Sequence, residues 1–250
     1  MNKILAVDTS TKVANVTVKN NNFILDETIN NEITHSEKLL PLIDKVLKGA
    51  GLNISDLNTL ACVLGPGSFT GIRIGIATIK AFANILKVPV FGVSSLELLA
   101  YNDFSDMPDL VLTLIDSRNN RAYYGLFEVK YIEHKNIIIP IIKNVVPLNN
   151  MLIEEVLSLV NDTMKLKYNQ NTKLLITGEF VENIQEQINS TLLSSKIVIK
   201  NNNLSSNTLI KMYENYKLLD NLDNYMYNYL DLDALYIRPS SAERLKNNEQ

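Results

Sequence analysis

The feature that most constrains the fold is an opening pattern that begins again near the middle of the chain. Val7-Asp8-Thr9 ends one short apolar run, and Ile115-Asp116-Ser117 ends another. An alanine follows each aspartate by six residues, and an aliphatic residue follows it by ten. Such a repeat predicts two copies of one domain, each opening with a meander of strands. Agreement between any two amphipathic hairpins is the alternative, because few positions match.

Short β-branched segments separated by polar residues predict three strands at the start of the chain. A helix follows, because Thr34 and Glu37 have capping-box spacing and apolar residues then recur at helical period up to Gly49. Pro41 predicts a kink in it or a later start. Further strands and helices alternate, which is typical of mixed sheets covered by helices. The expected strands are 4–9, 13–19, 23–29, 59–64, 88–93, 111–115, 122–129, 137–146, 174–177 and 196–200, and the later helices include 72–86 and 151–164.

A polar stretch with a proline, Asn102 to Asp109, marks the predicted boundary between the two halves. We expect a first domain over 1–102 and a second over 109–235. Each domain is expected to be α/β, with a mixed five-stranded sheet covered by helices. The remaining residues, 236–250, are expected to form a tail that packs back on the first domain.

The composition gives no global sign of nucleic-acid binding. The 250 residues carry 24 basic and 27 acidic side chains, a net charge of -3. If the protein acts on an RNA, other subunits should supply most of the phosphate contacts. Its single cysteine, Cys62, lies in an apolar run, and the first residues lack the core of a signal peptide. No apolar stretch is expected to approach the length of a membrane span. A cytoplasmic protein that does not enter a membrane is predicted.

The strongest local motif is GPGSFTGIRIG, from Gly65 to Gly75, between a predicted strand and a predicted helix. Glycines allow close backbone approach, and the first amides of a helix form an anion site. Asp8, at the end of the first strand, could hold a metal-bound phosphate nearby. This predicts a phosphate site made of Asp8, Gly65, Gly67 and Ser68. A tight turn with Ser68 or Thr70 as helix cap explains the motif equally well.

The helix after this loop is apolar on two sides. One stripe is Ile72, Ile76, Ile79, Ala83 and Leu86, and the other is Ile74, Ala77, Ala81, Phe82 and Ile85. A helix apolar around most of its circumference must be covered twice, and the second cover could come from a partner subunit. Complete burial within the chain is the alternative.

No catalytic constellation is evident. His35 has Lys38 and Leu39 where a helical metal pair needs a second histidine, and His134 lies in a polar turn. The sequence has no Gly-x-Ser-x-Gly elbow, and it lacks the Lys-Ser/Thr of a Walker loop. We therefore predict no catalytic residue and no metal site.

Four motifs stand out along the chain: HSEKLLP from His35 to Pro41, GPGSFTGIRIG followed by Ala77 and Lys80, Asp116-Ser117-Arg118, and Tyr236-Ile237-Arg238-Pro239. Together they resemble the TsaB (YeaZ) family. The resemblance covers nearly the whole chain and implies the actin-like ATPase (ASKHA, ribonuclease H-like) fold with two duplicated domains. It also implies a part in making N6-threonylcarbamoyladenosine at position 37 of tRNAs that read codons beginning with A.

Within that family the chain resembles the non-catalytic paralogue of TsaD. Leu39 stands where the catalytic paralogue has a second histidine, and Thr177-Gly178-Glu179-Phe180 stands where a glycine-rich loop is expected. The resemblance implies a scaffold that needs no cofactor, with vestigial ATP or ADP binding, and that supports transfer from threonylcarbamoyl-AMP. TsaD is the implied partner, TsaE joins a larger complex, and the chain forms a homodimer when alone. The implied partner interface is Leu39, Ile43, Val46, Arg73, Ile76, Ile79, Lys80 and Ala83.

A different class of function stays open. The chain could be a stand-alone ATPase or phosphotransferase of the actin-like fold that uses Asp8 and the loop from Gly65 to Gly71.

Overall fold

The structure is a computed structural model that describes residues 2–30, 35–192 and 196–237. The chain forms two compact units. The first consists of Met1–Leu98 and Leu204–Leu235, and the second is built around Leu99–Asn203. The predicted tail, apart from Tyr236 and Ile237, lies outside the described residues, as does the predicted cap residue Thr34.

The first unit holds a mixed sheet with the order β12-β5-β4-β1-β2-β3. The strands β1, β2 and β3 form an antiparallel meander, and β4 and β5 continue parallel to β1. Every residue from Ile4 to Val7 is buried, because β1 lies in the middle with both faces covered. The strands are β1 (Lys3–Asp8), β2 (Val13–Asn20), β3 (Phe23–Asn30), β4 (Thr59–Val63), β5 (Val90–Val93) and β12 (Met226–Tyr227).

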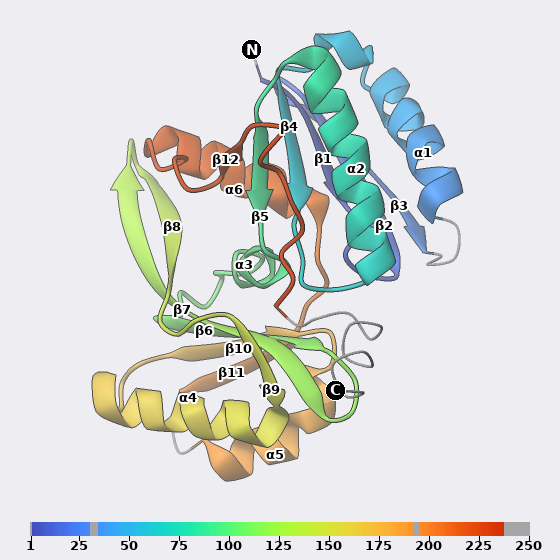
Figure 1. The fold of residues 1–250 in the computed structure, drawn as a ribbon. Helices are drawn as coiled ribbons and strands as arrows, with labels where there is room; N and C mark the ends of the chain where they lie inside the picture. The colour runs from blue at the N-terminus through green and yellow to red at the C-terminus, as the bar shows by residue number, and fades with distance from the viewer. Residues whose placement is uncertain (1, 31–34, 193–195, 238–250) are drawn as a thin grey trace. The chain divides into compact units, whose positions relative to one another are not determined.

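Helices cover both faces of this sheet (Figure 1). Leu5, Val7 and Leu60 face a core shared with α1 (His35–Gly49) and α2 (Phe69–Leu86). On the opposite face, Tyr213 of α6 (Ser206–Leu218) packs its ring edge-on against Phe91, with centroids 5.4 Å apart. The chain up to Ala100 also contains the short elements η2 (Ile54–Asp56) and α3 (Ser95–Ala100). Helix α1 runs through Pro41.

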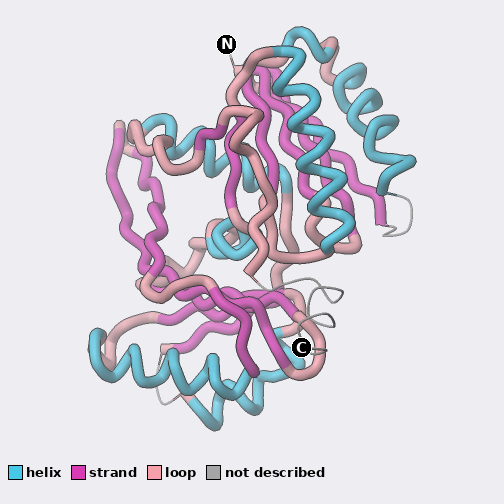
Figure 2. Tube along the Cα trace, in the orientation of Figure 1, coloured by secondary structure: helices cyan, strands magenta, loops and turns pink. Residues whose placement is uncertain are grey.

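The second unit repeats the strand order of the first. Its sheet has the order β11-β10-β6-β7-β8, with the same antiparallel meander and the same two parallel strands. Helices α4 and α5 cover the face that carries Leu110, Leu112 and Leu114. Figure 2 shows β7 and β8 as a long strand pair. The elements are β6 (Leu110–Asp116), β7 (Arg121–His134), β8 (Ile137–Asn144), β9 (Asn149–Leu152), α4 (Ile153–Lys167), β10 (Leu174–Gly178), η3 (Val181–Ile184), α5 (Gln185–Thr191) and β11 (Ile197–Asn201).

The repeated strand order confirms the predicted α/β fold with two mixed sheets, and two details are corrected. Each sheet has six strands among the described residues, since β12 joins β5 and β9 joins β7. Residues 204–235 belong to the first unit, whereas we placed them in the second. The reason is that the face of the first sheet bearing Ile4 and Phe91 needs an apolar cover, and α6 supplies it.

Candidate functional site

The glycine-rich loop lies directly on the turn between β1 and β2. The Ser68 amide donates to the Ser10 carbonyl oxygen over 2.6 Å, and the Thr9 hydroxyl donates to the Gly71 carbonyl oxygen over 2.7 Å. A Cβ atom at Gly67 would lie 2.2 Å from the Ser10 oxygen, and one at Gly71 would lie 2.0 Å from the Thr9 oxygen. These two glycines are therefore required by contact with the turn.

The polar groups of the predicted phosphate site take part in turn and cap hydrogen bonds. One oxygen of Asp8, Oδ1, accepts from the amide and the hydroxyl of Ser10, over 2.8 and 2.7 Å. The Ser68 hydroxyl accepts from the Gly71 amide over 3.3 Å and is the N-cap of α2. The structure thus brings Asp8, Gly67 and Ser68 together. The hydrogen bonds are those of a turn and a helix cap, the simpler of the two interpretations of the motif.

Gly65 has another role in the same loop. Its φ is +103°, a backbone conformation that favours glycine, and its carbonyl oxygen accepts from the Ser95 amide over 2.8 Å. A Cβ atom there would lie 2.8 Å from Cδ1 of Ile72. Gly65 therefore fixes the path from β4 into the loop.

Cys62, in β4, is fully buried. Burial raises the pKa of its thiol to about 12, and the nearby Asp8 charge adds to the shift. A thiol with so high a pKa is not a nucleophile at neutral pH. Among the described residues, no group of three or more His, Cys, Asp and Glu side chains could hold a metal ion, and the side chain of His35 lies outside them.

Most of the predicted interface residues belong to the core of the first unit. Six of the eight, Leu39, Ile43, Val46, Ile76, Ile79 and Ala83, are at most 6% exposed. Their side chains fill the space between α1, α2 and the sheet, so they cannot form a partner surface while the unit is folded. The predicted set is corrected to this extent. Arg73 is exposed, with its guanidinium 3.8 Å from the centroid of the Phe69 ring, and Lys80 is half-buried.

The second apolar stripe of α2 is left at the surface. We call it the outer face of α2: Ile74, Ala77, Ala81, Phe82 and Ile85. Ala77, Ala81 and Ile85 are exposed, and the exposed fraction of Ile85 is 75%. Leu40 on α1 is also 54% exposed. Ile74 and Phe82 are half-buried and pack partly against the core. Among the described residues the uncovered part of this face is therefore Ala77, Ala81 and Ile85, which fits the expectation of a second cover from outside the chain.

Helix α2 also meets the length and composition of a membrane span. It has 18 residues and a mean hydropathy of 1.3, so the expectation that no apolar stretch reaches that length is wrong. Its inner face is packed in the core with Leu5 and Leu60, and a core helix passes the same test.

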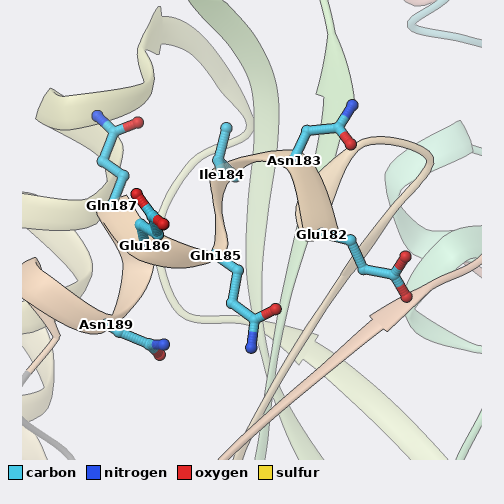
Figure 3. A pocket seen from close by; sticks show the side chains of 7 residues that line it. All are labelled: Glu182, Asn183, Ile184, Gln185, Glu186, Gln187 and Asn189. Atoms are coloured by element: carbon cyan, nitrogen blue, oxygen red, sulfur yellow. The ribbon is translucent and has the colours of Figure 1, made fainter.

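A hollow at the surface of the second unit carries no convergent chemistry. A single stretch of chain, from Glu182 to Asn189, supplies its lining side chains. Figure 3 shows them fanning out in different directions. An active site needs polar groups that point to one place, and this hollow lacks them.

The arrangement of the chain is that of known structures. YeaZ from Pseudomonas aeruginosa superposes with a TM-score of 0.72 and 21% identity, covering 94% of this chain and 100% of that one. The fold and the site therefore define a protein of two actin-like, ribonuclease H-like α/β units, with a glycine loop that caps an apolar helix.

The sequence comparisons give the family. The profile of the family described as "TsaD: tRNA N6-adenosine threonylcarbamoyltransferase" matches residues 24–209. The tRNA threonylcarbamoyladenosine biosynthesis protein TsaB of Buchnera aphidicola is 37% identical over 49% of this chain and 59% of its own length. TsaB of Bacillus subtilis is 30% identical over 64% of this chain and 66% of its own length. The chain belongs to the TsaD family, and within it to the TsaB (YeaZ) group. It spans less than two thirds of the length of these curated relatives.

Proposed function

We propose that this chain is a non-catalytic partner subunit in the formation of N6-threonylcarbamoyladenosine at position 37 of tRNA. Its TsaB-named relatives and its match to the TsaD profile support a place in that modification. In this proposal TsaD transfers the threonylcarbamoyl group from threonylcarbamoyl-AMP to the adenine N6. TsaE joins the two in a larger complex, in the cytoplasm.

The outer face of α2 is the observation that supports this proposal most directly. An exposed row with two alanines at its centre lets another helix approach closely, and the larger Ile74, Phe82 and Ile85 surround them. We propose that TsaD packs a helix on this face and also contacts the exposed Leu40 of α1. In the absence of TsaD, a second copy of this chain occupies the same face. With a net charge of -3, the chain leaves most tRNA contacts to its partners.

The test places a charge at the centre of the outer face. Ala81 is exposed, so Ala81→Glu should change the free energy of unfolding by no more than about 0.5 kcal/mol. It should weaken binding of purified TsaD at least about tenfold in calorimetric titration, because a buried, unpaired carboxylate opposes docking. Leu166→Glu is the matched control, since Leu166 is 84% exposed on α4 of the other unit. Equal TsaD affinity for both variants and the wild type would refute the interface.

A second candidate, a stand-alone ATPase or phosphotransferase, has one observation in its favour. The structure brings Asp8 and the glycine loop together from separate segments of the chain. Steady ATP hydrolysis by the purified chain, lost in Asp8→Asn, would support it. Binding of ATP or ADP without turnover is what we expect of the scaffold with its vestigial site.

A further inference from the structure

The last described stretch of the first unit runs alongside α2. We call residues 225–235 the strap; it is the red segment beside α2 in Figure 1. The strap begins at the edge of the sheet, where β12 pairs with β5. It ends where the Leu235 amide donates to the Leu64 carbonyl oxygen over 2.7 Å. Between these points Leu232 is buried in the core with α2. The strap is thus fixed at both ends and at its middle.

Lys80 of α2 and Lys87, the C-cap of that helix, contact the strap from the side. The Lys80 ammonium donates to the carbonyl oxygens of Leu232 and Leu230, over 3.1 and 3.5 Å. The Lys87 ammonium lies 4.9 Å from the centroid of the Tyr229 ring. We expected Lys80 to touch a partner, but its charge is used within the chain. Its contacts set the position of residues 230–232 against the helix.

The strap borders the outer face of α2. Ala77 is three residues before Lys80 and Asn84 is four after it, so the three lie in one row along the helix. Ala77 and Asn84 are exposed, and the carbonyl of Leu230 lies at the end of the Lys80 side chain. The exposed fraction of Leu230 is 69%. The backbone of Leu230 therefore lies beside the row of α2 that borders the surface proposed to bind TsaD, and its apolar side chain is exposed.

The outer face of α2 is too small to form a stable protein interface by itself. A stable complex commonly takes about 20–30 residues from each partner, whereas the outer face of α2 has five. The footprint of TsaD must spread from α2 to the segments on its flanks. The strap is one of these, and its exposed Leu230 would extend the apolar surface of α2 on that flank.

We propose that the strap is part of the surface that binds TsaD, with Leu230 as an apolar contact and Lys80 as a positioning residue that does not touch TsaD. This inference rests on the proposed function. It extends the proposed TsaD interface beyond α1 and α2 to the strap, which follows the second unit in the chain.

The test measures TsaD affinity by calorimetric titration for Leu230→Asp and Lys80→Met, singly and combined. Leu230→Asp should weaken binding about tenfold, and Lys80→Met about threefold. Because Lys80 acts through the strap, the double variant should bind no more weakly than Leu230→Asp alone. Leu166→Asp is the control for an exposed leucine elsewhere. Hydrogen exchange should be faster at amides 230–232 in Lys80→Met than in the wild type, and Lys80→Arg should restore both slow exchange and affinity.

The outcomes separate this inference from the proposed function. Wild-type affinity in Leu230→Asp, with binding still lost in Ala81→Glu, would overturn the role of the strap and leave the helix interface standing. Additive losses in the double variant, or unchanged exchange at 230–232, would overturn the positioning role of Lys80. A wild-type chain that does not bind TsaD would overturn both proposals.

Discussion

The turn between β1 and β2 and the turn between β6 and β7 begin alike and end differently. Each starts with an aspartate whose Oδ1 accepts an amide two residues on, from Ser10 in the first unit and Arg118 in the second, both over 2.8 Å. Asp8 is fully buried, whereas its counterpart Asp116 is exposed.

The difference arises after β4 and β10, the strands that pair in parallel with the first strand of each unit. After β4, the glycine loop folds over the first turn and leads into the long helix α2. After β10, the chain continues through Gly178 into the short η3. The second turn is braced instead by Asn150, which accepts from Nε of Arg121 over 2.9 Å and donates to the Ser117 hydroxyl over 2.6 Å. The two units thus keep the turn and differ in what covers it.

Cys62 lies in β4, the strand that leads into the loop over the first turn. We expect the largest effect in the rate at which its thiol is alkylated. With its pKa raised from 9.0 to about 12, the thiolate fraction at pH 8 falls about a thousandfold. Alkylation of the native chain should be slower than that of the urea-unfolded chain by at least that factor, because the buried thiol is also inaccessible. Native and unfolded rates within tenfold of each other would show that β4 is open.

The next effect concerns contact between loop and turn. Gly71→Ala places a Cβ atom 2.0 Å from a backbone oxygen of Thr9, so the loop must shift. We expect a loss of about 3 kcal/mol in the free energy of unfolding, measured by urea denaturation. Gly51→Ala is the control: it has open space but a φ of +67°, and should cost about 1 kcal/mol. Equal losses in the free energy of unfolding for the two variants would mean that Gly71 is not in close contact with the turn.

The smallest effect compares the two aspartates directly. Asp8→Ala removes the acceptor of a buried amide and a buried hydroxyl of Ser10, at a cost of about 2 kcal/mol. Asp116→Ala removes an acceptor that water can replace, at a cost of about 0.5 kcal/mol. Thermal and urea unfolding of the pair would check this. Similar losses would contradict the difference in burial.

The sequence predicted features that depend on local pattern. The echo of Asp8 at Asp116 predicted the repeated fold, because an aspartate after a first strand makes the same turn in both units. The two apolar stripes of α2 were also evident from their period. Which stripe faces the sheet could not be predicted, because periodicity defines faces and only the tertiary fold selects between them. For that reason Ile76 and Ile79 were assigned to a surface and are core.

Other errors have the same origin in long-range contacts. The strand Met226–Tyr227 is too short to show an alternating pattern, and it forms because β5 offers an edge. The place of α6 depends on a sheet face formed more than 180 residues earlier, as the hydrogen bond between the hydroxyls of Thr17 and Ser206 shows. The role of Lys80 depends on carbonyls 150 and 152 residues away. No local pattern carries such information.

The return of the chain to the first unit has a consequence for synthesis on the ribosome. The second unit is built from the continuous stretch Leu99–Asn203, and it can complete its sheet as soon as that stretch has emerged. The first unit begins earlier, but one face of its sheet is uncovered until α6 has been made. The half that is translated first is therefore completed last, and during that interval its exposed strands are the natural target of chaperones and proteases.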